Sequence, residues 1–451
     1  MKLQSYRVIE RRSSSDLTAR PTRNGSASQL VLVLGLCLLL IFGILAFGAV
    51  YKWSILIFEA GSVALFLIWV GRQLFSKEQQ LSKNSLYLPA LLFFGLVLAQ
   101  IVLGGSAYAY VTKYEALLYV SYGIVLLIAV ECVGDEDSRR LFATVMMSFG
   151  ALYAFFAVVQ ELTPNGKIFW VYSPHSHGSI YGSYVNHDHY AGLMEMLVTI
   201  PLVLSMGHLF TGGKRLLVGF CAVFMASTIF FSGSRGGMIA FVLEIVLFAA
   251  LNVTQRKRPG VAVGLVTLCA LVLAFLVFVG KGHVLGRLAD LGPGIRLNMT
   301  KDCLRMFLQR PVWGWGLETF PTVYPMYRSF NTDLFVNEAH NDYAQLLMET
   351  GLLGFVLMLW FVVALYRHGL PTSRRWEFRW DGALSLAALL GCTGILFHSF
   401  VDFNLHIPAN AALFYVLCGL AATELSSWSP RPRCTRTEAV EETVELSGEG
   451  N

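Results

Sequence analysis

Charge is scarce in this chain, and the scarcity excludes an ordinary soluble protein. Of the 451 residues, 14% are charged and 55% are hydrophobic. A soluble domain carries about 25% charged residues, which coat its water-facing surface. Disordered, collagen-like and coiled-coil chains are excluded on the same ground. The composition therefore predicts a membrane protein with most of its mass in lipid.

Other features are also missing. The eight cysteines form no Cys-x-x-Cys pair, and only Cys303 is expected to face outward, so neither a thiolate metal site nor a structural disulfide is predicted. No soluble sensor domain and no nucleotide-sugar domain can be recognised. An internal repeat, typical of many transporters, is not evident either. A polytopic transporter would have to use groups such as Glu59 and Glu244, which lie deep in apolar runs.

Long apolar runs fill the chain. A helix needs about 20 apolar residues to cross the hydrocarbon core. Twelve candidate spans cover 29–50, 53–75, 85–103, 114–133, 139–162, 188–209, 214–232, 236–252, 261–280, 342–366, 380–400 and 405–425. The seventh and eighth are separated only by the turn Ser232–Arg235. The sequence thus predicts an all-α polytopic membrane protein with about twelve transmembrane helices and a long helical extracytoplasmic loop between the ninth and tenth.

The positive charges fix the predicted orientation. Roughly two thirds of the 34 Lys and Arg fall on one side when the N-terminus is placed in the cytoplasm and the spans alternate. The domains are then a basic cytoplasmic tail (1–28), a transmembrane domain (29–425) with a periplasmic loop (281–341), and a disordered cytoplasmic tail (426–451). The net charge of +5 reflects this topology, so no nucleic-acid partner is expected.

Polar and aromatic residues gather in the outer segments, which predicts a site on the outer face. Arg235 lies in the turn Phe231–Gly237, between glycines. Exposed N–H groups at a helix start together with a guanidinium suit phosphate oxygens. An arginine that merely reaches the interface from a tight hairpin fits the same pattern.

The long loop contains a predicted amphipathic helix over 294–307. Its apolar stripe is Ile295, Met299, Cys303 and Phe307, and Lys301 and Arg305 lie opposite. Such a helix is expected to lie on the outer membrane surface. It is either a structural cover or a cationic platform beside a lipid phosphate.

The start of the tenth span carries the strongest pattern. His340 lies at the membrane–water boundary, where an imidazole can accept a proton near neutral pH. Asn341, Gln345 and Glu349 form a polar stripe that must face protein or water. We expect Gly351 and Gly354 to admit a neighbouring helix. A capping or packing histidine remains the alternative for His340.

Two further outer segments are rich in histidine. His175 and His177, followed by His187 and His189, form two His-x-His pairs, which suit zinc but are weak without an i, i+4 pair on a helix. We favour an aqueous loop that lines a sugar-binding vestibule, with no metal. The turn His398–Asn410, which contains Asp402, either orders the rim of the site or only closes a hairpin.

Together these residues resemble the O-antigen ligase family, the lipopolysaccharide ligases and related polymerases of bacterial surface polysaccharides. The family signature is His, then Asn, Ser or Gln, nine residues, Gly, two residues, and Gly, Thr or Tyr. It is matched throughout by His340-Asn341, Gly351 and Gly354. Ser234-Arg235-Gly236 resembles the family's Ser-Arg-Gly element. Arg296 occupies the place of the family's loop arginine, ahead of a Pro-x-x-Gly-x-Gly stretch at 311–316.

The resemblance implies a membrane glycosyltransferase that is inverting, metal-independent, cofactor-free and GT-C-like. Its donor would be a glycan on undecaprenyl diphosphate and its acceptor a hydroxyl of a glycan or of lipid A-core. The reaction would take place on the periplasmic face of the bacterial inner membrane, among membrane lipids. Catalysis would fall to His340, Arg235 and Arg296. Substrate binding would fall to Ser234, Arg305, Asn341, Glu349, His187, His189 and Asp402.

One alternative within the same superfamily is an O-antigen or exopolysaccharide polymerase. Arg305 followed by ten residues and Gly316 fits a motif associated with polymerases. The alternative of another class is the polytopic transporter.

Overall fold

The structure is a computed structural model that describes residues 27–75, 81–174, 179–255, 259–275, 293–332 and 335–423. Within these ranges every regular element is a helix, and the only strand-like features are the isolated bridges Ile168–Tyr172 and Tyr181–Tyr184. The all-α prediction is therefore confirmed. The predicted tails, apart from residues 27 and 28, and the first part of the periplasmic loop lie outside the described residues.

Each predicted apolar run coincides with one helix. The helices are α1 (Ala27–Leu45), α2 (Lys52–Phe75), α3 (Tyr87–Val102), α4 (Ala109–Cys132), α5 (Glu136–Leu162), α6 (His187–Met206), α7 (Gly212–Ser232), α8 (Arg235–Gln255), α9 (Pro259–Phe275), α13 (Asp342–Ser373), α14 (Trp380–His398) and α15 (Pro408–Ala422).

Among the described residues, nine of these helices are long and apolar enough to cross a membrane. The helices α3 and α15 are apolar but shorter, and α9 has 17 residues. A membrane protein is thus shown, whereas a count of twelve crossings stays a prediction.

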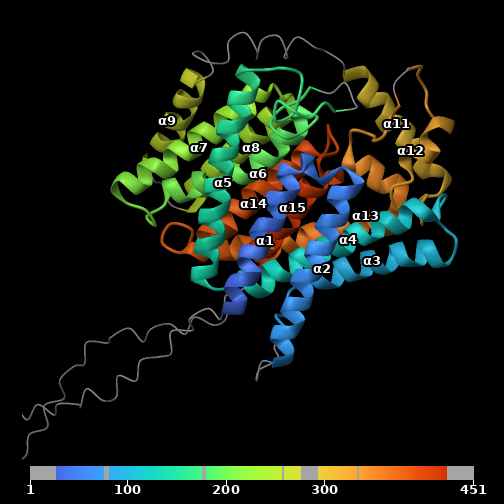
Figure 1. The fold of residues 1–451 in the computed structure, drawn as a ribbon, viewed down its shortest axis with the longest axis horizontal. Helices are drawn as coiled ribbons and strands as arrows, with labels where there is room; N and C mark the ends of the chain where they lie inside the picture. The colour runs from blue at the N-terminus through green and yellow to red at the C-terminus, as the bar shows by residue number, and fades with distance from the viewer. Residues whose placement is uncertain are drawn as a thin grey trace, which may run out of the picture.

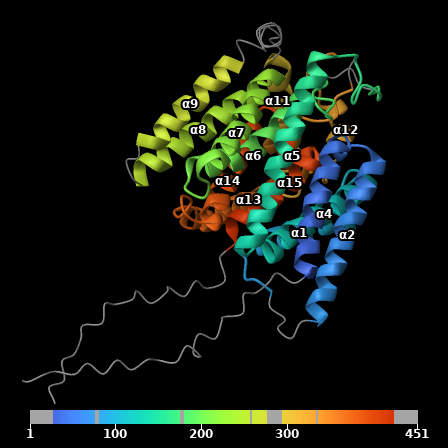
Figure 2. The ribbon, with the colours of Figure 1, turned by 60° about the vertical axis from the view of Figure 1, so that its left-hand side comes forward.

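The helices α6 and α14 lie at the centre of the molecule. In α6 every residue from Asp188 to Ser205 is buried, and α14 is buried over most of its length. They pack against each other, and α6 also packs against α7. Figures 1 and 2 show both helices enclosed by others, among them α5, α7 and α8. The residues at the N-terminal end of α6 and the C-terminal end of α14 are therefore held by a rigid, fully packed scaffold.

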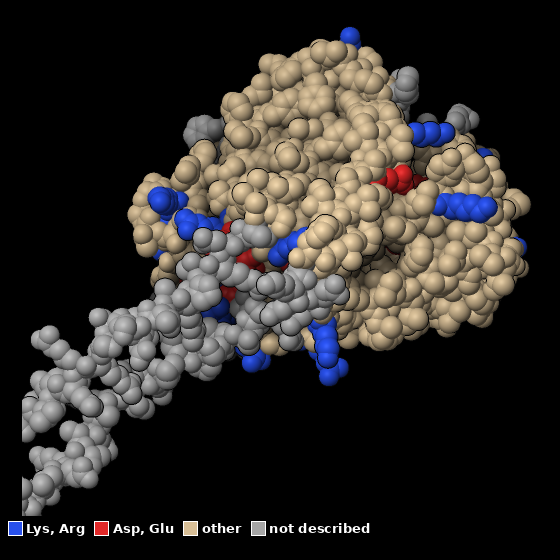
Figure 3. Space-filling view, turned by 60° about the horizontal axis from the view of Figure 1, so that its bottom comes forward, with Lys and Arg blue, Asp and Glu red and all other residues tan. Residues whose placement is uncertain are grey.

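The outward faces of the peripheral helices are apolar. Leu56 and Leu67 on α2 and Leu216 on α7 expose more than 60% of their area. On the face seen in Figure 3, most of the Lys and Arg lie in the lower left and lower middle, and the broad upper part carries few of them. A surface of this kind suits lipid, because exposed apolar patches of that extent are rare on soluble monomers.

The helix α13 is kinked at Gly351, whose φ is 66° and ψ −169°. The segment that precedes α12 docks at this kink: Leu352 donates its N–H to the Pro311 carbonyl at 2.8 Å, and Gly316 donates to the Glu349 carbonyl at 2.8 Å. A Cβ on Gly351 would collide with the Val312 carbonyl. The prediction that Gly351 admits a neighbouring helix is therefore wrong, since a loop backbone takes that place.

Residues 293–332 of the predicted periplasmic loop form a small packed unit beside α13. It contains α11 (Pro293–Gln309), α12 (Phe320–Val323) and the 3-10 turn Tyr324–Met326. Met299, Cys303 and Met306 of α11 enter a hydrophobic cluster with Phe320 and Met348. The predicted helix is confirmed, but its packed face differs from the predicted stripe, because Asp302 is fully buried and Ile295 is 49% exposed.

Replacing Gly351 by Ala should destabilise the protein by about 1–3 kcal/mol or more, because only glycine tolerates this backbone conformation and the new methyl group meets a carbonyl. The measurement is thermal unfolding in detergent. The matched control is Gly104→Ala, since Gly104 also has a positive φ of 69° but open space around it. Equal losses in the two variants would show that the loop is not docked at the kink.

Candidate active site

Five elements meet around the N-terminal end of α6 and the C-terminal end of α14. They are the first turn of α6, the turn between α7 and α8, the first turns of α11, the start of α13, and the turn between α14 and α15. Two buried carboxylates, Asp188 on α6 and Asp402 in the α14–α15 turn, lie at the centre of this arrangement, and we call them the carboxylate pair. Most of the candidate side chains contact one member of this pair.

His340 contacts Asp402. Its Nδ1 lies 3.0 Å from Asp402 Oδ1, and its side chain is 26% exposed whereas Asp402 is fully buried. The His340 backbone has a φ of 50°, and the next residue, Asn341, caps α13. The Phe403 ring packs edge-on against the imidazole at 4.7 Å between ring centres. With Nδ1 engaged, Nε2 is the ring atom that can meet a substrate.

Asp402 is held in its ionised form. Burial alone would raise the pKa of this carboxyl, but the hydrogen bond to His340 and the nearby His189 and His398 lower the pKa well below its usual value. A carboxylate in this state fixes the orientation of the imidazole.

Asp188 contacts the arginine of α11. Arg296 donates through Nη2 to Asp188 Oδ2 at 3.1 Å and through Nη1 to the Val401 carbonyl at 2.6 Å. Ser234 donates its hydroxyl to Asp188 Oδ1 at 2.6 Å. Arg296 therefore joins α11 to both α6 and the α14–α15 turn.

The turn between α7 and α8 is built for close packing. Gly233 ends α7 in the left-handed region, and Arg235, which is exposed, begins α8. A Cβ on Gly236 would lie 2.5 Å from the His398 ring, and one on Gly237 would lie 2.6 Å from Ala191. The Gly237 N–H is bonded to the Ser234 hydroxyl at 3.2 Å. The glycines thus let the start of α8, which carries Arg235, pack closely against α14 and α6.

His187 and His189 both border the carboxylate pair. His187 Nε2 lies 3.6 Å from Asp188 Oδ1 and is partly exposed. His189 is buried, with Nε2 3.8 Å from Asp402 Oδ2. Those two atoms have no hydrogen-bond partner within the described part of the chain. His187 can reach a substrate, whereas His189 faces inward.

Three of the predicted substrate-binding residues have structural partners elsewhere. Arg305 pairs with Asp302 at 3.0 Å on α11 and is 62% exposed. The Asn341 side chain accepts from the Ala344 N–H at 3.0 Å as a helix cap. Glu349 is buried and accepts from the N–H groups of Glu318 and Phe320, at 2.9 and 3.2 Å, which ties α13 to the loop. Their substrate roles remain predictions.

Two clusters have the spacing of a metal site. Asp188, His398 and Asp402 form one, and Glu318, Glu338 and His406 form the other, each with ligand atoms within 4.8 Å of one another. In the first cluster every member already has a protein partner: Asp188 has Ser234 and Arg296, and Asp402 has His340. The predicted pair His175 and His177 lies outside the described residues.

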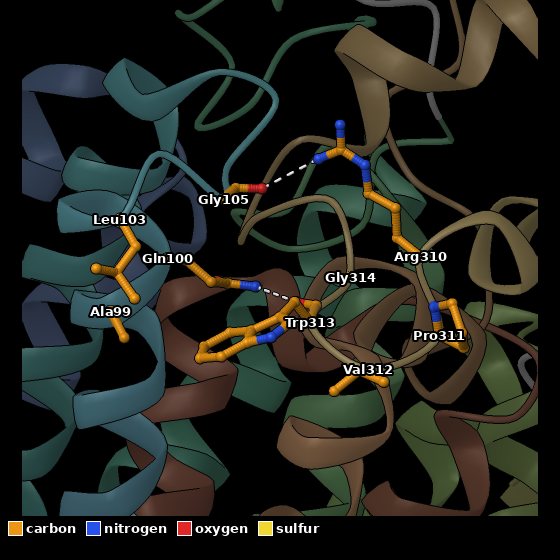
Figure 4. A pocket seen from close by; sticks show the side chains of 9 residues that line it. All are labelled: Ala99, Gln100, Leu103, Gly105, Arg310, Pro311, Val312, Trp313 and Gly314. Atoms are coloured by element: carbon orange, nitrogen blue, oxygen red, sulfur yellow. Dashed lines mark hydrogen bonds between the residues drawn. The ribbon is translucent and has the colours of Figure 1, made fainter.

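A separate cavity of about 480 Å³ lies between the end of α3 and the docked loop (Figure 4). Arg310 donates to the Gly105 carbonyl at 3.1 Å across it, and Gln100 donates to the Trp313 carbonyl. The side chains of Trp313, Leu103 and Ala99 give it an apolar wall. None of the predicted catalytic residues lines this cavity.

Sequence reasoning missed three of the groups at the site. Asp188, Glu195 and His398 were not predicted as site residues, although Glu195 and His398 are ionisable and lie within or at the end of apolar runs. Such residues need partners inside the protein, and this signal could have identified them.

The comparison with known families found a match for part of the chain. Residues 220–359 match the family model described as O-Antigen ligase, and the resemblance seen in the sequence is confirmed. The match includes Arg235, Arg296 and His340, while His187, His189 and Asp402 lie outside it. A search of curated proteins found no match.

Replacing Asp402 by Asn should destabilise the protein in a pH-dependent way. Because the pKa of Asp402 is lowered on folding, its carboxylate stabilises the fold fully above the ordinary aspartate pKa of about 3.9 and progressively less below it. Thermal unfolding of both proteins in detergent between about pH 7 and pH 3 measures this. The difference between them should shrink as the pH falls, and a constant difference would contradict the assignment.

Proposed function

We propose that this member of the O-antigen ligase family moves a glycan from undecaprenyl diphosphate to an acceptor sugar hydroxyl on the periplasmic face of the bacterial inner membrane. One observation carries the proposal. Arg296 is bonded to Val401 and His340 to Asp402, which are consecutive residues of one turn. A guanidinium suited to phosphate and an imidazole suited to a proton are thus held side by side.

The arginines act on the leaving group. As the glycosidic bond breaks, the diphosphate oxygen gathers negative charge, and fixed cations in a site with little water stabilise that charge strongly. Arg296 offers its planar fork, and Arg235 stands at the start of α8, next to Ser234. In the structure Asp188 holds Arg296 in place at 3.1 Å, and the diphosphate would share or replace this carboxylate.

His340 acts on the acceptor. Its Nε2 takes the proton of the sugar hydroxyl as the hydroxyl oxygen bonds to the anomeric carbon, while the bond from that carbon to the diphosphate breaks. Undecaprenyl diphosphate leaves with the bonding electrons. Asp402 stabilises the resulting imidazolium through Nδ1. This single displacement inverts the anomeric centre.

Other parts of the proposal follow from the same chemistry. The two guanidinium groups can supply the electrostatic stabilisation that a metal ion would give, so transfer is metal-independent and cofactor-free.

Both termini are cytoplasmic, and membrane lipids surround the helices. His187 and Arg305, both accessible, are the best placed of the predicted substrate-binding residues to meet the sugars, the lipid or the acceptor.

A polymerase of the same superfamily is the second candidate, because the spacing from Arg305 to Gly316 fits a motif associated with polymerases. The same carboxylate pair would serve it, with a growing glycan as acceptor in place of lipid A-core. The transporter alternative gains no support from the family match.

Substitution of Arg235, Arg296 or His340 by Ala should each reduce glycan transfer by roughly 100-fold or more, since each removes charge stabilisation or proton transfer. Purified protein in detergent with a lipid-linked repeat unit and an acceptor gives the rate. Lys301→Ala is the matched control, because Lys301 is exposed on α11 and should be dispensable. Near-normal rates in all three alanine variants, with correct membrane insertion, would remove the mechanism.

The ligase assignment makes its own prediction about the acceptor. Supplied with lipid-linked repeat units alone, the wild-type protein should form no longer chains, and added lipid A-core should be glycosylated. Gel separation of the labelled products measures both outcomes. Chain growth without an added acceptor would make the protein a polymerase.

A further inference from the structure

A second imidazole lies beneath the carboxylate pair, and the mechanism above does not use it. His398 ends α14 and is 1% exposed. Its Nδ1 lies 3.3 Å from both carboxylate oxygens of Glu195, a fully buried residue of α6. A ring nitrogen of His398 also lies within 4.8 Å of oxygens from both Asp188 and Asp402. His398 therefore faces Glu195 and both members of the pair.

The position of this ring is fixed by close backbone contacts. The first turn of α8 meets its other edge, since a Cβ on Gly236 would lie 2.5 Å from both Cδ2 and Nε2. The helices α6 and α14 are closely packed beside Glu195, because a Cβ on Gly391 of α14 would lie 3.0 Å from the backbone of Met196.

The charges around the ring explain what it does. Asp188 and Asp402 are like charges in a region from which water is excluded, and they repel unless cations balance them. Arg296 contacts one and His340 the other. The groups that face His398 are Glu195 and Asp188 from α6 and Asp402 from the adjoining turn, while Glu244 of α8 faces Gly394 one turn earlier on α14. A positive charge on His398 offsets the repulsion between the two carboxylates.

We propose that Glu195 and His398 form a buried carboxylate–imidazole pair that positions Asp188 and Asp402. Through these two carboxylates, the pair keeps Arg296 and His340 correctly oriented toward the substrate. His398 is a positioning residue, because it touches neither donor nor acceptor. This inference rests on the proposed transfer reaction. It adds the pair of side chains that links the phosphate-binding Arg296 to the proton-accepting His340.

Replacing His398 by Gln tests the pair. Without the positive charge the two carboxylates move apart, so kcat should fall roughly 10- to 100-fold and the donor KM should rise, as expected when a charge-assisted interaction is lost. The acid limb of the pH profile of kcat/KM should also move to higher pH, because Asp402 then attracts a proton more strongly at the site. A purely structural role would lower the active fraction without moving that limb.

Two further variants sharpen the result. Glu195→Gln should shift kcat, KM and the acid limb in the same direction as H398Q, and it serves if H398Q fails to fold. Glu244→Gln is the matched control: Glu244 is buried in the same α6–α8–α14 interface, and its carboxylate oxygens have no hydrogen-bond partner among the described residues, so its kinetics should match the wild type.

The outcomes separate the two proposals. If the wild-type protein transfers no glycan from the lipid-linked donor, the proposed function fails. If H340A is inactive while H398Q and E195Q keep the wild-type kcat, KM and pH profile, only the positioning pair fails. If the wild type contains one equivalent of metal that H398Q lacks, and EDTA stops transfer, then His398, Asp188 and Asp402 are metal ligands and the pair is overturned.

Discussion

The site depends on two carboxylates that lie buried at the outer ends of packed membrane helices. A charge in such a place is costly, and it persists only when opposite charges and hydrogen bonds surround it. Asp188 and Asp402 meet this requirement through contacts with Arg296, Ser234, His340 and His398, which come from four different parts of the fold. The groups proposed for phosphate binding and proton transfer are therefore also the groups that make the buried charges tolerable.

The fold supplies the rigidity that this arrangement needs. The helices α6 and α14 are buried almost throughout, and glycines at Gly236, Gly237 and Gly391 let neighbouring helices approach them closely. The loop that carries Arg296 is secured separately, by its own hydrophobic cluster and by its docking at the kink of α13. Positioning residues on helices rather than on long loops gives a site little freedom to lose its geometry.

The helices could be predicted from the sequence because the length and hydrophobicity of a run of residues are local properties. Each apolar run became a helix, and the signature from His340 to Gly354 predicted the family whose model matches residues 220–359. Contacts between distant residues could not be predicted in this way. The Arg296–Asp188 bond spans 108 residues, and the His398–Glu195 contact spans 203, so no local pattern links the partners. The role of Gly351 was missed for the same reason. The loop that docks against its backbone comes about 40 residues earlier in the chain.

The most direct measurement is a cryo-electron microscopy structure with an undecaprenyl diphosphate-linked sugar bound. The account predicts the diphosphate against Arg235 and Arg296, with the anomeric carbon open to attack by a hydroxyl hydrogen-bonded to His340 Nε2. A diphosphate bound far from Arg296, or a sugar that His340 cannot approach, would contradict it.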